Sequence, residues 1–216
     1  MKILALSDEV VESLYRPEIK DRFGDVDVIL GCGDLPFFYL EFMVTILGKP
    51  LYYVHGNHDK PSQYLSDGRI IDRAEGCESL ENQVLKITAN GTSALVAGLG
   101  GSIRYNVGPH QFTQAEMNAR LLNLSPALLT NRVRHGRFLD ILIAHAPPRG
   151  IHESGDFAHT GFEAFCTLMD RFRPKYLLHG HSHVYRNDAV TATRYKDTQV
   201  LNVYPYRLIE FGKNYV

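Results

Sequence analysis

Short apolar runs alternate along the chain with segments whose apolar residues recur at helical spacing. The apolar runs have the length of buried strands and occupy residues 2–6, 26–31, 51–54, 139–144 and 176–179. The helical patterns occupy residues 11–23, 36–47, 113–133 and 161–172. Proline is favoured in the first turn of a helix and breaks its interior, so we expect the first helix to begin near Arg16 or Pro17 and the third to be interrupted at Ser125-Pro126. This alternation predicts an α/β layered fold.

The middle and the end of the chain have a different pattern. Short apolar runs separated by turn residues predict antiparallel hairpins there, and a loop should follow over residues 98–109. These runs are residues 69–72, 84–88 and 93–97. Three further runs predict a closing antiparallel meander, at residues 189–193, 199–203 and 207–211. The simplest arrangement of all these elements is two mixed β-sheets flanked by helices.

Length, charge and cysteine usage narrow the class of protein. The 216 residues, 44% hydrophobic and 22% charged, suit one domain or a tight pair of an ordinary globular protein. A net charge of −1 argues against a dedicated duplex-DNA binder, because such proteins carry a basic surface. Three widely spaced cysteines form no disulfide framework and fit a reducing compartment. The first apolar run is too short for a signal peptide or a membrane span, so we expect a cytoplasmic protein with no membrane partner.

The strongest predicted strands each end in polar residues that can bind a metal ion. The first three lead to Asp8, to Gly33-Asp34 and to Gly56-Asn57-His58-Asp59, and the two later ones to His145 and to Gly180-His181-Ser182-His183. The carboxyl ends of strands converge in α/β sheets, so these side chains should meet. Mixed oxygen and nitrogen donors suit a borderline divalent ion (Mn²⁺, Fe²⁺, Co²⁺, Ni²⁺ or Zn²⁺) better than Ca²⁺ or an iron–sulfur cluster.

Each residue also has an ordinary structural explanation. Taken singly, Asp8 could cap a turn, Gly33-Asp34 could be a common turn, and His145 could be a hydrogen-bonded core histidine. The motifs Gly-Asn-His-Asp at 56–59 and Gly-His-Ser-His at 180–183 are rarer, because each places several polar side chains directly after an apolar strand. Taken together and in this order, the residues indicate a metal site or the remnant of one.

The ordered motifs resemble those of the calcineurin-like metallophosphoesterase superfamily, and the sequence Ala-His-Ala-Pro-Pro at 144–148 is typical of its small phosphodiesterase-type members. The resemblance implies a four-layer α-β-β-α sandwich of two mixed β-sheets flanked by helices. It further implies a single calcineurin-like phosphoesterase domain over residues 1–216, with a helical excursion at about 102–137.

The same resemblance implies a centre of two divalent ions. Asp34 would bridge them, Asn57, His145 and His181 would bind one, and Asp8 and His183 would bind the other. His58 matches the family's catalytic histidine, which approaches the substrate phosphate without binding metal.

One departure from the family pattern concerns the first motif. The family has Asp-x-His with both ends on one ion, whereas this chain has Asp8-Glu9-Val10, and valine cannot bind a metal. We expect Glu9 not to substitute, because neighbouring residues near a strand end point in opposite directions. His152 and His159 could approach from the 150–161 loop. The implied consequence is a weaker first site with more bound water, or a centre with one ion.

Two ions about 3.5–4 Å apart could hold a hydroxide and a phosphoryl oxygen. The hypothesis is that a hydroxide at Asp34 attacks phosphorus while His58 stabilises the developing charge or protonates the leaving oxygen. Asp59 could orient His58 or cap the following turn.

Several other residues have weaker functional explanations. Arg104 or Arg149 could hold a substrate phosphate, whereas the arginines at 132, 134 and 137 are better explained as a solvated face. Cys32 is better explained as a packing residue than as a nucleophile. Tyr105 could stack on a nucleobase.

We therefore predict a metal-dependent phosphoesterase that acts on a small phosphorylated substrate, a phosphodiester or a phosphomonoester. A nuclease would need a basic path for the strand, which the near-zero net charge does not support. A different alternative is a catalytically weak or inactive interaction module with the same fold, as in the metallophosphoesterase-like subunit of retromer. The missing Asp-x-His histidine favours the module, whereas His58, a histidine with no ligand role, favours the enzyme. The pattern predicts no particular oligomeric state.

Overall fold

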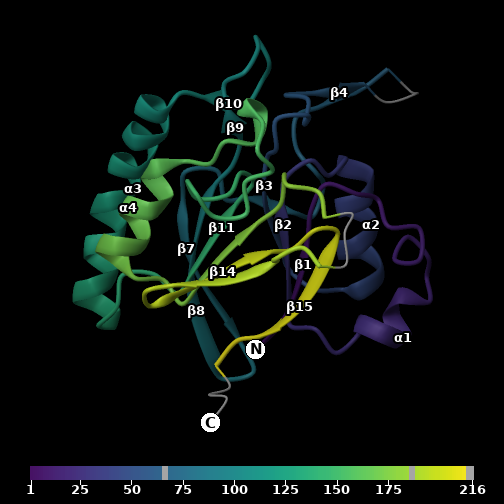
Figure 1. The fold of residues 1–216 in the computed structure, drawn as a ribbon. Helices are drawn as coiled ribbons and strands as arrows, with labels where there is room; N and C mark the ends of the chain where they lie inside the picture. The colour runs from purple at the N-terminus through teal and green to yellow at the C-terminus, as the bar shows by residue number, and fades with distance from the viewer. Residues whose placement is uncertain (65–67, 185–187, 213–216) are drawn as a thin grey trace.

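A computed structural model describes residues 1–64, 68–184 and 188–212 of the chain. In this part of the chain, two β-sheets face one another between two layers of helices (Figure 1). The first sheet contains, in spatial order, β15 (Tyr206–Glu210), β1 (Lys2–Leu6), β2 (Val28–Cys32), β3 (Leu51–Val54) and β6 (Glu78–Ser79). The second contains β13 (Ala192–Tyr195), β14 (Thr198–Asn202), β12 (Tyr176–His179), β11 (Ile141–Ala144), β8 (Thr92–Leu99) and β7 (Val84–Ala89).

The helices cover the two outer faces. Those on the first sheet are α1 (Ile19–Phe23) and α2 (Phe37–Leu47), and those on the second are α3 (Gln114–His135) and α4 (Glu163–Phe172). Two short strand pairs, β4 (Gln63–Tyr64) with β5 (Ile70–Ile71) and β9 (Ser102–Ile103) with β10 (Gln111–Phe112), lie outside the large sheets. A 3₁₀ turn, η1 (Phe157–His159), precedes α4.

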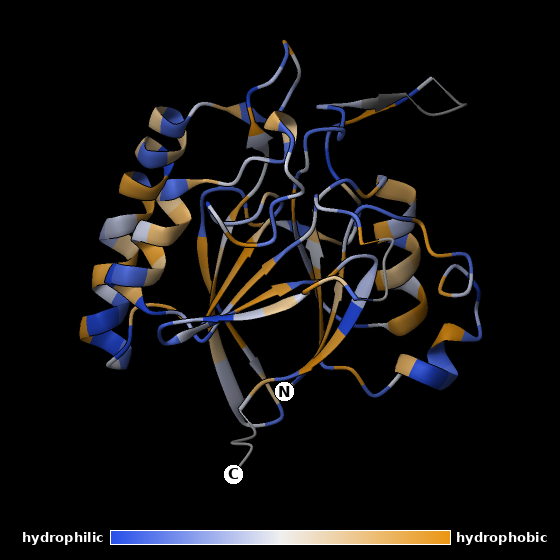
Figure 2. Cartoon of the chain, in the orientation of Figure 1, coloured by the Kyte–Doolittle hydropathy of each residue, from blue (hydrophilic) through white to orange (hydrophobic). Residues whose placement is uncertain are grey.

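Alternating side chains of the buried strands form three apolar layers. On β1, Ile3 and Ala5 pack between the two sheets, whereas Leu4 and Leu6 pack beneath α1 and α2. On β11, Ile143 packs between the sheets and Leu142 packs against α3 and α4. Because both faces of each sheet are covered, the central strands are apolar along their whole length (Figure 2). This is the predicted four-layer sandwich of two mixed sheets, and the prediction is confirmed.

Strand direction brings the site together. Strands β1, β2 and β3 are mutually parallel, as are β8, β11, β12 and β14. Antiparallel partners lie at the margins, where β15 pairs with β1, β13 with β14, and β7 with β8. In each sheet, the loops that follow the parallel strands therefore all lie at the same end of the strands, the carboxyl end.

Several predicted elements were wrong in extent. Residues 12–18 form turns and bends, so α1 begins at Ile19, two residues after the expected start at Pro17, and has only five residues. The predicted loop at 98–109 contains the end of β8 and the strand β9. In the tail, β13 and β14 form the expected antiparallel pair, but β14 lies parallel to β12 and β15 crosses to the first sheet, so the three strands are no meander.

The third helix is continuous, contrary to prediction. Pro126 lies inside α3 and is exposed, so its ring meets solvent rather than the sheet. Ser125 Oγ donates to the Leu121 carbonyl at 3.0 Å. The Leu122 carbonyl, which loses its amide donor to the proline, belongs to a residue that is 64% exposed, where water can replace the donor. No helix within the described ranges is both long and apolar enough to cross a membrane.

Candidate metal centre

Five parallel strands end at the candidate site. Asp8 follows β1, Asp34 follows β2 and Asn57 follows β3, all in the first sheet. His145 and His181 follow β11 and β12 of the second sheet. The site therefore lies where the two sheets meet at the carboxyl ends of their strands, as predicted.

Three of the predicted ligands form one compact group. Asp34, His145 and His181 each offer a ligand atom, and these atoms lie within 4.8 Å of one another. His145 Nε2 is 3.3 Å from Asp34 Oδ2 and 3.0 Å from Asn57 Oδ1, which adds the asparagine amide to the group. The structure thus brings together the four residues Asp34, Asn57, His145 and His181.

Asp8 and His183 form a pair beside this group. His183 Nε2 lies 3.4 Å from Asp8 Oδ1, and the His181 amide donates to both Asp8 carboxylate oxygens at 3.1 and 3.0 Å. The Asp8 side chain is 1% exposed, whereas His183 is 39% exposed and stacks on Tyr204. Burial raises the pKa of Asp8, but the hydrogen bond from His183 and the charge of His145 together outweigh it, so the net pKa lies below the usual range.

Unusual backbone geometry directs these side chains into the site. Asp8, Asp34 and His181 all have left-handed backbone angles, with φ of 64°, 55° and 63°. Each such non-glycine residue costs about 1–2 kcal/mol, a strain that clusters at functional sites. At two positions the chain approaches too closely for any side chain: a Cβ at Gly56 would collide with Asp34 Oδ1, and one at Gly180 with Asp8 Oδ2.

Hydrogen bonds fix the donor atoms of both buried histidines. His145 Nδ1 donates to the Cys32 carbonyl at 2.9 Å, so Nε2 faces Asp34 and Asn57. His181 Nε2 donates to the Ala158 carbonyl at 2.9 Å, which leaves the Nδ1 lone pair for a metal ion.

The electrostatic environment of the group favours a bound cation. Burial lowers the pKa of His145, but the Asp34 and Asp8 carboxylates and the Cys32 carbonyl together raise it more, to about 10. Burial also raises the pKa of Asp34, but His145 lowers it more, to well below its usual range. Burial lowers the pKa of His181 to about 3, which keeps this imidazole neutral and able to bind metal. Two imidazoles, a carboxylate and an amide oxygen that surround a point requiring positive charge fit a borderline divalent ion.

The loop after β3 places His58 and Asp59 differently from each other. His58 is exposed, and its backbone N–H donates to Asp34 Oδ1 at 2.8 Å, so this residue lies beside the group. Asp59 Oδ2 accepts the backbone N–H groups of Asp34 at 3.0 Å and Gly56 at 2.8 Å. These N–H groups belong to the loops after β2 and β3 and not to the turn that follows Asp59, so the predicted cap of the following turn is wrong, and Asp59 instead holds the Asp34 backbone.

Val10 stands where the family has a metal-binding histidine, and the residues considered as replacements for that histidine lie in different places. Val10 packs against the apolar cluster beneath α1 and α2. Glu9 is exposed, and its carboxylate accepts the Tyr204 hydroxyl at 2.7 Å. The His159 ring lies 4.6 Å from the His181 ring and so borders the centre. His152 instead bonds to His179 and Thr193, at 2.8 and 2.9 Å.

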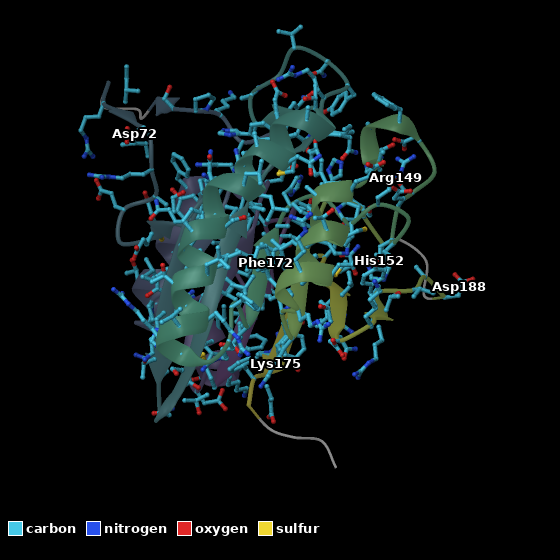
Figure 3. The ribbon with its side chains drawn as sticks, turned by 90° about the vertical axis from the view of Figure 1, so that its left-hand side faces the viewer. Asp72, Arg149, His152, Phe172, Lys175 and Asp188 are labelled. Carbon is cyan, nitrogen blue, oxygen red and sulfur yellow. The ribbon has the colours of Figure 1, made fainter. Side chains whose placement is uncertain are left out.

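The other candidates of the sequence lie apart from the centre or are engaged elsewhere. Arg104 pairs with Glu116 at 2.9 Å, and Arg149 lies 3.6 Å from Glu153. Arg149 and His152 lie on the same side of the molecule, at the right of Figure 3. Cys32 is fully buried between the sheets, and burial raises the pKa of its thiol, which agrees with a packing role.

Two features of the site were not predicted. The Tyr105 hydroxyl accepts a hydrogen bond from Asn57 Nδ2 at 3.0 Å, although no motif connects residues 48 positions apart. A cavity of about 690 Å³ opens beside the centre, with a lining that includes His152, Glu153, Ser182, His183, Thr193 and Asn202.

Comparison with solved structures supports this architecture. TT1561 of Thermus thermophilus is 16% identical at a TM-score of 0.59, with 94% of this chain and 88% of that chain covered. A hypothetical protein from Thermus thermophilus is 17% identical at a TM-score of 0.51, with 94% and 75% covered. Vps29 from Cryptosporidium parvum is 12% identical at a TM-score of 0.43, with 94% and 72% covered. At these identities the first two show a shared fold only.

Comparison of the sequence gives the family. No curated protein matches the chain. The profile of the calcineurin-like phosphoesterases, however, matches residues 1–185, a segment that contains every residue of the group and of the Asp8–His183 pair. The chain therefore belongs to the calcineurin-like phosphoesterase family.

Proposed function

We propose that this chain is a metal-dependent phosphoesterase that hydrolyses a small phosphodiester or phosphomonoester. The observation that carries the proposal is the convergence of Asp34, His145 and His181 within 4.8 Å, in a member of the calcineurin-like phosphoesterase family. Asn57 completes this group as the fourth ligand, and Asp8 with His183 forms a second, weaker site that lacks the histidine replaced by Val10.

In the proposed reaction, the protein positions the metal ligands and supplies the negative charge that holds the ion. A divalent ion, when bound, makes hydroxide available at neutral pH and neutralises charge on the phosphoryl oxygens. Asp34 belongs to the group, and its charge also acts on Asp8 and His183 of the neighbouring pair, so it supplies negative charge that both sites share. Asp59 holds the Asp34 backbone, and the His58 backbone N–H and the close approach of Gly56 keep the Asp34 carboxylate in place.

His58 is the proposed catalytic residue. The residue is exposed, and its backbone N–H donates to Asp34 Oδ1, which places it beside the group. An imidazole in this position can donate a hydrogen bond to a phosphoryl oxygen, or a proton to the leaving oxygen as the P–O bond breaks. No ligand role competes for it.

The cavity beside His183 is the proposed site for the organic part of the substrate. About 690 Å³ falls within the range of small-molecule pockets, and a phosphate at the centre would place one ester arm next to it. The free cysteines support a cytoplasmic protein, and Mn²⁺ is the first ion we would test.

The experiment combines metal content with hydrolysis of bis(p-nitrophenyl) phosphate, with and without added Mn²⁺. We expect one or two ions per chain and turnover stimulated by Mn²⁺. His58→Ala should lower kcat at least about a hundredfold, as removal of a general acid does. His135→Ala, at the distant end of α3, should leave kcat unchanged. Full activity of His58→Ala would reject its assigned role.

One observation favours a non-catalytic alternative. Val10 packs into the core where the family's first motif has a ligand, so the chain could be an interaction module that retains the fold. That alternative predicts no tightly held metal and no hydrolysis after Mn²⁺ addition. Metal binding without hydrolysis of any phosphoester would also reject the enzyme.

A further inference from the structure

Tyr105 contacts the metal centre from a loop that belongs to neither large sheet. The loop joins β9 to β10 (Figure 1). The phenol oxygen of Tyr105 accepts the Asn57 Nδ2–H at 3.0 Å. The other end of the same amide, Oδ1, is 3.0 Å from His145 Nε2. Asn57 is 4% exposed, so its amide is confined between the phenol and the centre.

A buried glutamine fixes the position of Tyr105. Gln111 is 5% exposed, and its Oε1 accepts the backbone N–H groups of Tyr105 and Asn106, both at 3.1 Å. Gln111 Nε2 donates to Asn106 Oδ1 at 2.7 Å. Burying an amide is costly unless it is hydrogen-bonded, and here both ends of the Gln111 amide shape this one loop.

The far end of the loop is also attached to the strand that carries Asn57. His110 has a left-handed backbone (φ 51°), and its ring stacks on His55 at 4.5 Å and 14°. His55 directly follows β3 and lies two residues before Asn57. The loop is thus attached at two points, with Tyr105 aimed at Asn57.

An asparagine binds metal only through its oxygen. Rotation of the Asn57 amide by 180° would turn Oδ1 away from His145 Nε2 and point at the centre an NH₂ group, which offers no lone pair to a metal ion. An acceptor on the outer side holds the NH₂ outward and the oxygen inward, as partners of metal ligands generally do. Tyr105 is that acceptor.

We propose that Tyr105 is a positioning residue that orients the Asn57 amide for metal binding. This inference rests on the proposed function only in taking Asn57 as a ligand. It is distinct from the nucleobase-stacking prediction for Tyr105, because the contact to Asn57 uses the hydroxyl and not the ring face. The assignment predicts that the loss of one oxygen atom weakens metal binding.

The test is a titration of chelator-treated protein with Co²⁺, followed by its visible absorption. Tyr105→Phe should lower the affinity about tenfold and alter the absorption bands, while the unfolding midpoint of the metal-free protein stays close to wild type. Tyr195→Phe removes the same atom at the other end of the second sheet and should change neither quantity.

A double-mutant cycle isolates the route through Asn57. In an Asn57→Ala background, Tyr105→Phe should cause no further loss of Co²⁺ affinity, because its target is gone. Equal losses in the two backgrounds, or wild-type affinity and spectrum in Tyr105→Phe, would overturn the proposal. Because the readout is metal binding, a protein that behaves as expected here yet hydrolyses no phosphoester would reject the proposed function and retain this inference.

Discussion

At the residue scale, the centre depends on side chains that do not bind metal. Asp59, 9% exposed, uses one carboxylate oxygen to accept two backbone N–H groups, from Asp34 and Gly56, in loops of different strands. It therefore joins the end of β2 to the end of β3. This connection fixes the relative position of Asp34 and Asn57, since the two residues lie in these two loops.

Asp59→Ala should leave both N–H groups unsatisfied. Each such buried group costs about 1–3 kcal/mol, so we expect the free energy of unfolding to fall by about 2–4 kcal/mol in urea titrations of the metal-free protein. Asp72→Ala, at an exposed carboxylate, should change it by less than about 0.5 kcal/mol. Equal effects of the two substitutions would contradict the role of Asp59.

A second feature at this scale is a chain of hydrogen bonds that runs from Gly180 through His179 and His152 to Thr193. His179 Nδ1 donates to the Gly180 carbonyl at 3.0 Å, so His179 Nε2 accepts from His152 Nδ1 at 2.8 Å. His152 Nε2 then accepts the Thr193 hydroxyl at 2.9 Å. This order requires both imidazoles to be neutral. Burial, with a smaller contribution from Arg207, lowers the pKa of His152 to about 4.

This lowered pKa predicts a pH dependence of stability. The pKa of histidine in an unfolded chain is about 6.5, so between about pH 6.5 and 4 the unfolded chain binds a proton that His152 does not bind in the folded protein. Stability contributed by His152 is therefore complete above pH 6.5 and lost as the pH falls through this window. Urea titrations should show a smaller loss between pH 6.5 and 4 in His152→Gln than in wild type. His135→Gln, on α3, should keep the wild-type dependence, and an unchanged slope in His152→Gln would refute the hydrogen-bond order.

At the element scale, α3 carries a defect that the fold tolerates. Pro126 cannot donate to the Leu122 carbonyl, yet the helix continues from Gln114 to His135. Its N-terminus has a capping box between Thr113 and Glu116, and its buried face packs Met117 and Leu128 on the second sheet. Tertiary packing thus outweighs the local cost of the proline.

Pro126→Ala should restore the missing hydrogen bond at an exposed position. An interior proline costs about 3 kcal/mol relative to alanine, and the alanine chain regains about 1 kcal/mol of unfolded-state entropy. We expect a net gain of about 1–2 kcal/mol in the free energy of unfolding, measured in guanidinium titrations. A loss of stability would mean that the proline ring makes contacts that stabilise α3.

The elements differ in how well the sequence predicts them. β1, β3 and β12 coincide with their predicted ranges, because an apolar run bounded by polar residues carries its own limits. The end of each run also marks a candidate ligand position, which is why Asp8, Asp34 and His145 could be found by pattern alone. The contact of Tyr105 with Asn57, and the crossing of β15 to the first sheet, depend on packing between distant segments, and no local periodicity encodes them.

At the scale of the whole molecule, the centre joins the two sheets. Asp34 and Asn57 come from the first sheet, and His145 and His181 come from the second. The sheets otherwise meet through the apolar cluster that contains Ile3 and Ile143. A metal ion held by ligands of both sheets would bind only the folded chain, since unfolding separates them.

Bound metal should therefore stabilise the molecule as one unit. A ligand at 100 times its dissociation constant adds about 2.7 kcal/mol when it binds only the folded state. We expect one cooperative thermal transition, as a single domain over residues 1–216 requires, and a midpoint that rises by several degrees when Mn²⁺ replaces chelator. Asp34→Asn keeps the shape of the side chain but loses the charge that both sites share, so its midpoint should not respond to Mn²⁺. Two separate transitions, with Mn²⁺ moving only one of them, would mean that the sheets unfold independently and that the ligands of a single sheet suffice to bind the ion.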